Sequence, residues 1–432
     1  MNLDQVSQSF QFHGSDVRRN IHIDGMDFVS SLPQVARLDD PVKSFYTSYL
    51  GKQKPTHFAK SMGRITYIDL FCGGGGLSLG VSEALSTFGF QPKPLVAVDI
   101  DNQALKLADA NFSPIVKRSQ SVEELIKYSV DLSQSINDFI TQPVILDQQI
   151  AQFKGKTDLL IGGPPCQGHS NLNNKTRRND PRNLLYFVMP AFAVAMDIPC
   201  VIIENVRSIT RASENVVGIT SEILRTHGYF VEEKVVSALD FGVAQTRTRH
   251  FLIATKVAKP RIAEIYDALK VDHLTFDDVI GQGLCNQGFS QLMISEPELS
   301  EVNRSRIDYL FDNSQFNLPD PQRPDCHRDG NTYPSVYGRL QGDQPLYTIT
   351  TGFGSPGRGR FIHPHQRRTI NAREAGRAQA FPDWYWNSID ELNLTKNSLY
   401  KIIGDAVPSL MVVPLVASIL ESINAKALRA AS

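Results

Sequence analysis

The sequence of 432 residues has little of what marks a secreted or membrane-spanning protein. It holds five cysteines, an odd number without paired spacing, which argues against a disulfide framework and for a reducing compartment. The first residues include neither a basic start nor an apolar stretch, so we expect no secretory signal. The window that we judge most apolar, residues 189–203, is interrupted by Asp197 and two prolines, which disfavours a membrane span. We therefore expect a cytoplasmic protein.

Other absences narrow the kind of site. Lys and Arg number 44 against 45 Asp and Glu, so the formal net charge of −1 gives no sign of a nucleic-acid partner, and only local basic clusters can indicate one. No Walker lysine follows the glycine run of residues 73–76, which disfavours a triphosphate-binding loop. Cys326-His327, His363 and His365 lack the spacing of zinc ligands, so we expect no metal.

The length permits a large core and a second, smaller domain, and the chain shows no internal repeat. Residues 1–63 show no sustained hydrophobic period, so we expect an N-terminal extension that is partly ordered at best. Strand and helix patterns alternate over residues 64–255, which is typical of an α/β domain. This rhythm stops in residues 256–394, where we expect a smaller, irregular domain, and we expect residues 395–432 to return to the first domain.

A glycine-rich turn opens the α/β pattern. The sequence predicts a strand over residues 65–71, a turn over 72–76 and a helix over 77–85, in which the glycines would let the backbone approach a ligand. The next predicted strand, 94–99, ends in Asp99, a carboxylate placed to bind a ribose hydroxyl pair. Glycine runs are often only loops, but the pair of features favours an adenosine-type ligand without a phosphate cluster. A candidate third strand, 128–132, ends near Asp131, whereas 116–124 and 133–152 look like surface decoration.

The most informative stretch is Gly162-Gly-Pro-Pro-Cys-Gln-Gly-His-Ser170, which follows the apolar run 158–161. Such a break from strand to glycine and proline falls at the carboxyl edge of an α/β sheet, where ligands bind. Cys166, on a backbone stiffened by two prolines, is placed like a nucleophile. The alternative is a turn that carries a buried structural cysteine.

Two later strand ends carry polar groups. Glu204 lies at the tip of the apolar strand 199–206, where it either caps a helix or performs proton chemistry, and position alone does not separate these. Gln245, Arg247 and Arg249 alternate at the entrance of the strand 248–255, so we expect their donors to point one way.

Basic side chains gather in two segments. The polar loop 171–183 follows the cysteine, and its Lys175, Arg177, Arg178 and Arg182 could meet phosphates as part of a mobile lid, although a solvated loop is common. Residues 352–377 contain six arginines against Glu374 alone, a local charge of +5 that predicts a phosphate-tracking surface.

A thiolate, a carboxylic acid, guanidinium groups and an adenosine pocket suit addition to an electron-poor ring followed by alkyl transfer. The motifs, in this order, resemble those of DNA (cytosine-5)-methyltransferases of the bacterial restriction-modification type. They are Asp69-Leu-Phe-Cys-Gly-Gly-Gly-Gly-Leu77, Gly163-Pro-Pro-Cys-Gln-Gly168, Glu204-Asn-Val206, Gln245-Thr-Arg-Thr-Arg249, Arg373-Glu-Ala-Gly-Arg-Ala-Gln-Ala-Phe-Pro382 and Gly404-Asp-Ala-Val407.

The resemblance implies a Rossmann-like S-adenosylmethionine-dependent methyltransferase fold with a small target-recognition domain over residues 256–394. It also implies a target cytosine flipped out of duplex DNA into the Cys166 pocket. The catalytic residues would be Cys166, Glu204, Arg247 and Arg249. The cofactor-binding residues would be Asp69, Phe71, Gly73, Gly75, Gly76, Leu77, Asp99, Ile100, Asp131, Leu132, Pro164, Asp405, Ala406 and Val407. The DNA-binding residues would be Gln167, Ser170, Lys175, Arg177, Arg178, Arg182, Gln245, Arg358, Arg360 and Arg373.

The expected partners are double-stranded DNA and a cognate restriction endonuclease that acts separately, and we expect a monomer that associates with the nucleoid when bound to DNA. One departure from the family pattern is Asp405, where members often have Asn after the glycine; it puts an extra carboxylate near the cofactor. Two alternatives stay open: a tRNA cytosine-5-methyltransferase on the same scaffold, and a catalytically silent DNA-binding homologue.

Overall fold

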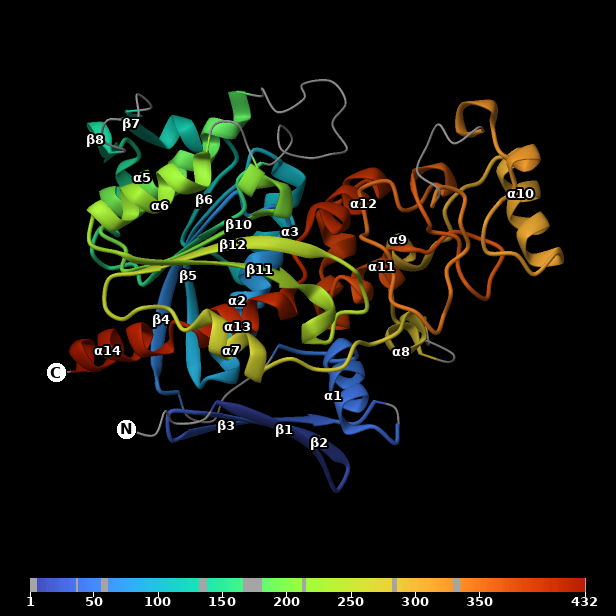
Figure 1. Cartoon of the computed structure of the whole chain (residues 1–432), viewed down its shortest axis with the longest axis horizontal. Helices are drawn as coiled ribbons and strands as arrows, with labels where there is room; N and C mark the ends of the chain where they lie inside the picture. Colours follow the sequence, from blue (N-terminus) through green and yellow to red (C-terminus); the bar gives the residue numbers. More distant parts are fainter. Residues whose placement is uncertain are drawn as a thin grey trace.

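The computed structural model describes residues 6–35, 38–55, 61–131, 138–165, 181–211, 215–281, 286–328 and 335–431, and for residues 181–183, 211 and 426–431 it describes the backbone alone. At its centre lies a seven-stranded sheet with the order β11-β12-β10-β9-β4-β5-β6 (Figure 1). Its strands are β4 (Gly63–Leu70), β5 (Phe90–Val98), β6 (Val116–Arg118), β9 (Leu159–Gly162), β10 (Cys200–Val206), β11 (Phe230–Ser237) and β12 (Thr248–Thr255).

Strands β10, β9, β4, β5 and β6 run parallel, whereas β12 is antiparallel to both of its neighbours, β10 and β11. The parallel strands read as continuous apolar runs because helices cover both faces of the sheet. One face carries α2 (Gly76–Thr87), α3 (Asn102–Phe112) and the C-terminal helices, and the other carries α5 (Val188–Ala195) and α6 (Val216–Thr226).

The predicted order of strands and helices from residue 64 to residue 255 is confirmed, but the third strand of the sheet was misplaced. That strand is β6, within a segment that we expected to be surface decoration. The candidate strand near Asp131 is β7 (Ile126–Val130), which pairs with β8 (Phe139–Ile145) in a separate two-stranded sheet. The error arises because β6 has three residues, too few to show any period. The short helix η1 (Val122–Leu125) lies between β6 and β7, and α4 (Gln148–Ala151) follows β8.

The N-terminal segment is ordered where the structure describes it, so the expectation of partial order is wrong there. β1 (Ser7–His13), β2 (Asp16–Ile23) and β3 (Met26–Pro33) form an antiparallel sheet, followed by α1 (Pro41–Leu50). Alternate residues of β2 are buried, but one of them is Arg19, which hides the apolar alternation from a reading of the sequence. The Arg19 Nη2 and Nε atoms donate to the Gln8 Oε1 atom at 2.8 and 3.1 Å, and the guanidinium lies over the Phe10 ring.

The small domain contains short helices joined by long irregular segments, at the right of Figure 1. Of the α-helices within residues 256–394, α7 (Ile262–Ala268) packs on β11 and lies beneath the sheet in Figure 1. The others are α8 (Phe276–Ile280), α9 (Gln291–Ile294), α10 (Glu301–Asp312) and α11 (Ala372–Ala378). This domain has a small apolar cluster of its own around Ile307, Leu310 and Ile362, which is separate from the main core. By contrast, α8 and α11 pack into the main core together with the sheet domain.

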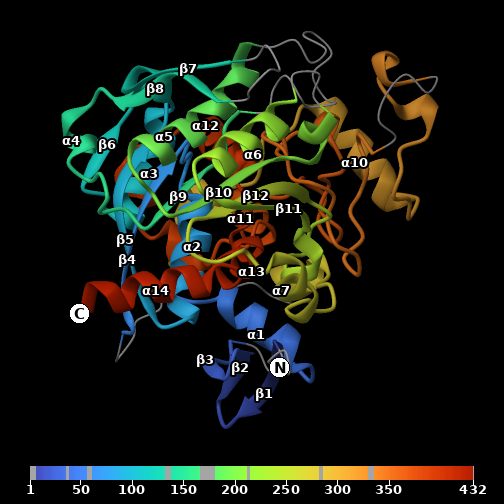
Figure 2. The same cartoon turned by 60° about the vertical axis from the view of Figure 1, so that its left-hand side comes forward.

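The C-terminal segment returns to the sheet, and Figure 2 shows its helices α12, α13 and α14 beside the sheet domain. It consists of α12 (Lys396–Asp405), η10 (Ser409–Val412), α13 (Val413–Ala417) and α14 (Leu420–Ala431). The run Lys396–Ala417 is long and apolar enough to span a membrane by length and composition, a window that we did not single out from the sequence. Because 83% of that window is buried and it packs on α2, it is a core segment of the fold.

Candidate active site

The glycine loop joins the carboxyl ends of two neighbouring strands. After β4 the backbone takes left-handed conformations at Phe71, Gly73 and Gly75, with φ of 59°, 52° and 89°, and α2 begins at Gly76. The Gly73 N–H donates to the Asp99 Oδ2 atom at 2.7 Å, which fastens the loop to the end of β5. A Cβ atom built on Gly73 would meet no atom within 4 Å, so the loop faces open space there.

Segments distant in sequence close the other side of this loop. A Cβ atom on Gly76 would lie 2.9 Å from the Val407 oxygen and 3.4 Å from the Ala406 Cβ atom, so the C-terminal segment lies against the first turn of α2. The Tyr385 hydroxyl donates to the Gly74 carbonyl. The structure thus brings Ala406 and Val407 to the glycine loop, as the resemblance implied.

Asp69 is a buried carboxylate beneath this loop. Its Oδ2 atom accepts the Ser78 hydroxyl at 2.6 Å, and its Oδ1 atom has no hydrogen-bond partner among the described residues. Burial raises the pKa of Asp69 from 3.8 to about 7, against the hydrogen bond from Ser78. An unmatched acceptor beside a glycine loop fits a cationic ligand group.

The extra carboxylate at Asp405 is matched by a lysine. The Lys401 Nζ atom lies 3.3 Å from the Asp405 Oδ2 atom and 3.1 Å from the Asp101 Oδ2 atom. Asp101 caps α3 directly after the Asp99 turn, so Lys401 joins α12 to the segment that follows β5. Burial raises the pKa of Asp99, and the charge of Lys401 is one of the influences that lower it.

The other expected cofactor residues that the structure describes lie in different settings. Leu77 is buried in the first turn of α2, whereas Ile100 is 76% exposed beyond Asp99. Asp131 follows β7 in the separate two-stranded sheet, and Leu132 lies outside the described residues.

The second half of the site lies at the ends of β9 and β10. In the parallel register Gly162, the last residue of β9, pairs with Ile203, so Gly163 comes next to Glu204, which is still within β10 and pairs with Phe251 of β12. A Cβ atom on Gly163 would lie 2.9 Å from the Glu204 Oε2 atom, and the Asn205 Nδ2 atom donates to the Pro164 carbonyl at 3.1 Å. The carboxylate therefore lies directly against the glycine-proline turn, whose close approach tolerates no side chain.

Glu204 is held by one of the predicted arginines. The Arg249 Nε atom lies 2.8 Å from the Glu204 Oε1 atom, and the two side chains are 15% and 10% exposed. Burial raises the pKa of Glu204 above its ordinary value of 4.5, although the charges of Arg249 and Arg247 oppose the shift. A raised pKa suits a carboxyl group that donates or shares a proton near neutral pH.

Gln245 and Arg247 extend into the interior, where they bond to other segments, although the charge of Arg247 still acts on Glu204. The Arg247 Nη1 atom donates to the carbonyls of Ile349 and Gly404 at 3.0 and 3.3 Å. Gln245 is fully buried; its Nε2 atom donates to the Ala378 carbonyl and its Oε1 atom accepts the Ile349 N–H. The two residues therefore connect the sheet domain to the small domain and to the C-terminal segment.

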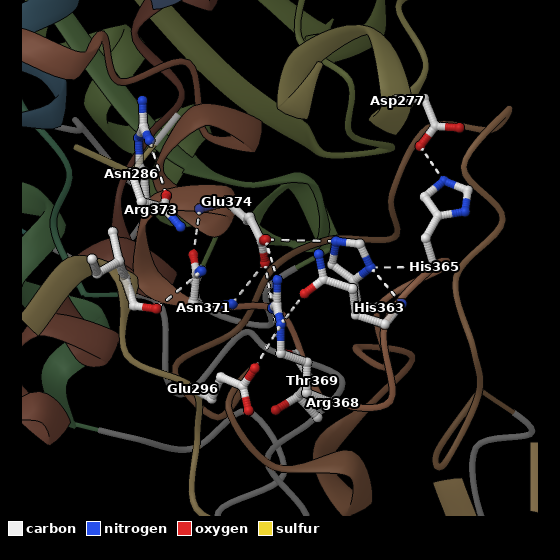
Figure 3. Close-up of polar contacts among 12 residues, drawn as sticks. Asp277, Asn286, Glu296, His363, His365, Arg368, Thr369, Asn371, Arg373 and Glu374 are labelled. Carbon is white, nitrogen blue, oxygen red and sulfur yellow. Dashed lines mark hydrogen bonds and ion pairs between the residues drawn. The ribbon is translucent and has the colours of Figure 1, made fainter. Parts of the chain in front are cut away.

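The arginine-rich segment 352–377 supplies interior ion pairs as well as surface charge. Arg368 donates both Nη atoms to the Glu374 carboxylate, at 2.6 and 2.8 Å, and His363 lies 3.5 Å from the same group (Figure 3). Burial alone would raise the pKa of Glu374, but Arg368 and His363 outweigh it and lower the pKa to about 2. The expected phosphate-tracking surface is thus reduced, because a charge count does not distinguish exposed arginines from paired ones.

Arg373, expected at the DNA, is likewise buried. Its Nη2 atom donates to the Asp383 Oδ2 atom at 2.9 Å, and Arg377 contacts the same carboxylate. Arg358 is exposed, whereas Arg360 is half-buried and donates to the Phe316 and Arg339 carbonyls. Cys166, Gln167, Ser170, Lys175, Arg177 and Arg178 lie outside the described residues, as does the side chain of Arg182.

Sequence reasoning missed four residues that build this site: Ser78, Asn205, Tyr385 and Lys401. Asn205 stood inside a recognised motif, so its position could have been noted. The other three contact partners that are 9, 311 and 300 residues away in the chain, and no local signal marks them.

The strand order, the glycine loop after β4 and the carboxylate after β5 define an S-adenosylmethionine-dependent methyltransferase. Two solved structures share the fold. The Schizosaccharomyces pombe Dnmt2 methyltransferase has a TM-score of 0.55 at 17% identity and covers 84% of this chain and 100% of its own. A DNA modification methyltransferase encoded within an Escherichia coli prophage has a TM-score of 0.51 at 23% identity and covers 83% of this chain and 99% of its own.

The chain belongs to the family of C-5 cytosine-specific DNA methylases, whose sequence profile matches residues 65–425. It is similar to the Type II methyltransferase M1.BsuMI of Bacillus subtilis, at 36% identity over 94% of this chain and 93% of the relative. It is also similar to the Type II methylase M.HgiDII of Herpetosiphon aurantiacus, at 30% identity over 79% of this chain and 91% of the relative. The protein is a DNA (cytosine-5)-methyltransferase that uses S-adenosylmethionine as its methyl donor.

Proposed function

We propose that the protein methylates carbon 5 of a flipped-out cytosine in a specific duplex DNA sequence through a covalent adduct with Cys166. The observation that carries the proposal is the contact of the Glu204 carboxylate with Gly163, three residues before Cys166 in the chain. A nucleophile and an acid on neighbouring strand ends match the two groups that activate a cytosine ring.

In this mechanism the Cys166 thiolate attacks carbon 6 of the ring, and its sulfur–carbon bond forms as the 5,6 double bond opens. Glu204 holds a proton at ring nitrogen 3, which offsets the negative charge that develops there. Arg249 fixes the Glu204 carboxyl group by the 2.8 Å contact. Carbon 5 becomes the nucleophile. When bound, S-adenosylmethionine would supply the methyl group, and the bond from this methyl group to the sulfonium sulfur would break so that S-adenosylhomocysteine leaves. A base then removes the carbon 5 proton, and the thiolate leaves as the double bond reforms.

The cofactor would lie along the loop that Gly73, Gly75 and Gly76 form. The residues present fit it, since the Asp69 Oδ1 atom offers an acceptor to a positively charged group and Asp99 offers one to ribose hydroxyls. Ala406 and Val407 would close the site from the C-terminal segment, with Phe71, Leu77, Ile100, Asp131, Leu132 and Pro164 as further contacts.

For DNA we propose contacts from Gln167, Ser170, Lys175, Arg177, Arg178 and Arg182, and from Arg358 and Arg360 of the small domain. Gln245 and Arg373 are 0% and 3% exposed, so we propose that they act on DNA binding indirectly, by positioning the segments that they contact. Arg247, which is 3% exposed, stays a proposed catalytic residue with Arg249. We propose residues 256–394 as the sequence-reading domain and residues 64–255 as the catalytic one.

The two relatives named Type II methyltransferase and Type II methylase support a place in a restriction-modification system. A cognate endonuclease would then recognise the same sequence and act separately. We propose that the enzyme works as a monomer, in the cytoplasm and on the nucleoid.

Bisulfite sequencing of DNA from cells that express the protein tests the proposal. We expect protected cytosines at one position of one recurrent sequence, and none with Cys166→Ser. The purified wild type should also form a denaturation-resistant complex with a duplex that carries 5-fluorocytosine at that position, whereas Cys166→Ser should not. Transfer of label to tRNA alone, or normal methylation by Cys166→Ser, would contradict the proposal.

A further inference from the structure

The N-terminal module, defined here as β1–β3 and α1, is a structured addition outside the profile of the family, which begins at residue 65. Figures 1 and 2 show its helix α1 between the three-stranded sheet and the rest of the molecule. The 94% coverage in the match with the Bacillus subtilis relative exceeds what residues 65–432 alone can supply. That relative therefore shares part of the segment, which argues against an incidental extension.

One face of α1 contacts the loop that leads to Arg247 and Arg249, the two arginines expected to be catalytic. A Cβ atom on Gly242, where φ is 75°, would lie 2.5 Å from the Tyr46 Cδ1 and Cε1 atoms, so the tyrosine ring rests on the backbone of this turn. The turn belongs to a loop closed by the Ala238 N–H, which donates to the Arg247 carbonyl at 2.8 Å. Tyr46 thus supports the loop that leads to Arg247 and Arg249.

Two other side chains of α1 contact α8, the helix that follows α7 in the chain. The Lys43 Nζ atom lies 3.1 Å from the Asp278 Oδ2 atom, and the Thr47 hydroxyl donates to the Asp278 carbonyl at 3.2 Å. Asp278 forms the capping box of α8 with Thr275, so these bonds hold α8 at its N-terminal turn.

From α8 two connections lead further into the small domain. The neighbouring Asp277 contacts His365 at 2.8 Å, and the Nδ1 atom of His363 accepts the backbone N–H groups of His365 and Gln366 (Figure 3). The Arg377 Nη1 atom donates to the Val279 carbonyl at 2.9 Å, which joins α8 to α11. A shift of α8 would therefore be transmitted to both.

We propose that α1 is a strut that fixes the small domain relative to the arginine loop, with Lys43, Tyr46 and Thr47 as positioning residues for DNA binding. The inference rests on the proposed function, because it assigns the small domain to DNA recognition. The physical reason is preorganisation: if the two DNA-contacting parts are held in register, less free energy is spent on ordering them when DNA binds. Within the described part of the chain, these three side chains make no polar contact with the residues of the proposed cofactor site, which should therefore be unaffected.

The test uses two variants. The double variant carries both Lys43→Met and Thr47→Val, which removes both polar bonds to Asp278 and keeps the apolar bulk of the side chains. The control variant carries Asp24→Asn alone. Asp24 pairs with Arg261 at 2.6 Å, so its substitution weakens another attachment of the same module without contacting α8. The substrate is a duplex that carries the sequence identified by bisulfite sequencing. Steady-state methylation gives KM and kcat, and amide hydrogen exchange reports on residues 276–280 and 363–369.

For the double variant we expect a KM for DNA about fivefold to tenfold above that of the wild type, from the loss of an ion pair and a hydrogen bond. We expect kcat within about twofold, unchanged cofactor affinity, and faster exchange in residues 276–280 and 363–369. Asp24→Asn should match the wild type in all of these. Equal effects in the two variants, or a fall in kcat at unchanged KM, would overturn the strut. A wild type that transfers no methyl group to any DNA would instead overturn the proposed function, while the exchange data would still report on the coupling.

Discussion

The Arg249 Nε atom lies 2.8 Å from the Glu204 Oε1 atom, and this pair joins the end of β10 to the antiparallel strand β12. The contact leaves the Oε2 atom against Gly163, at the turn that precedes Cys166. One oxygen of the carboxyl group is thus held while the other faces the proposed nucleophile turn. Arg247, two residues earlier, instead extends into the interior.

This difference predicts separate effects for two matched substitutions. Arg249→Lys should lower kcat about tenfold to hundredfold with little change in stability, because Glu204 loses its fixed partner. Arg247→Lys should lower the free energy of unfolding by about 2–4 kcal/mol, because buried carbonyls lose a donor. Single-turnover methylation and urea denaturation of both variants distinguish the cases. Equal loss of stability in the two variants would contradict the assignment.

Asp69 predicts a pH dependence of stability. Its pKa is raised from 3.8 to about 7 by burial, so the native state favours the protonated form. A raised pKa contributes stability that is fully present below about pH 4 and is lost as the pH rises through about 7, at most about 4 kcal/mol for this shift. Asp69→Asn, which stays neutral, should therefore gain stability relative to the wild type between pH 4 and pH 8. Thermal unfolding of both proteins across that range measures the difference, and a constant or falling difference would refute the prediction.

Gly76 predicts a selective loss of cofactor binding. In Gly76→Ala the new methyl group would lie 2.9 Å from the Val407 oxygen, and the C-terminal segment would have to move away from the glycine loop. We expect the Kd for S-adenosylmethionine to rise at least about tenfold, which corresponds to about 1.4 kcal/mol. Gly218→Ala in α6 is the control, because its methyl group would meet only the flexible Asn215 side chain. Calorimetric titration of both variants should show unchanged affinity in the control alone.

Asp383 predicts a stability defect in the arginine-rich region. Its buried carboxylate pairs with both Arg373 and Arg377, so Asp383→Ala would leave two buried guanidinium groups without this partner. We expect a loss of about 3–5 kcal/mol in the free energy of unfolding. Asp308→Ala removes a comparable pair with Arg367, which is exposed, and should cost about 0–1 kcal/mol. Chemical denaturation that gave similar losses for the two variants would contradict the interior role of the arginines.

Features that depend on neighbouring residues could be predicted from the sequence. Apolar runs bounded by glycine and proline placed the strands that end at residue 70, at residue 162 and near Glu204, since hydrophobic pattern and turn chemistry are local properties. Because parallel strands end at one edge, the same pattern placed the glycine loop and the turn before Cys166 together.

Which charged groups remain at the surface became clear from the folded chain alone. Arg373 and Arg377 meet Asp383 inside the molecule, and Lys401 meets Asp101 from 300 residues away, so their partners follow from packing and not from spacing. The sheet of the N-terminal module was also missed in the sequence, because Arg19 interrupts the apolar alternation of β2. The buried position of Arg19 is tolerable because its guanidinium bonds to Gln8, on the neighbouring strand. Long-range burial sets the free energy of each such group, and no local pattern records it.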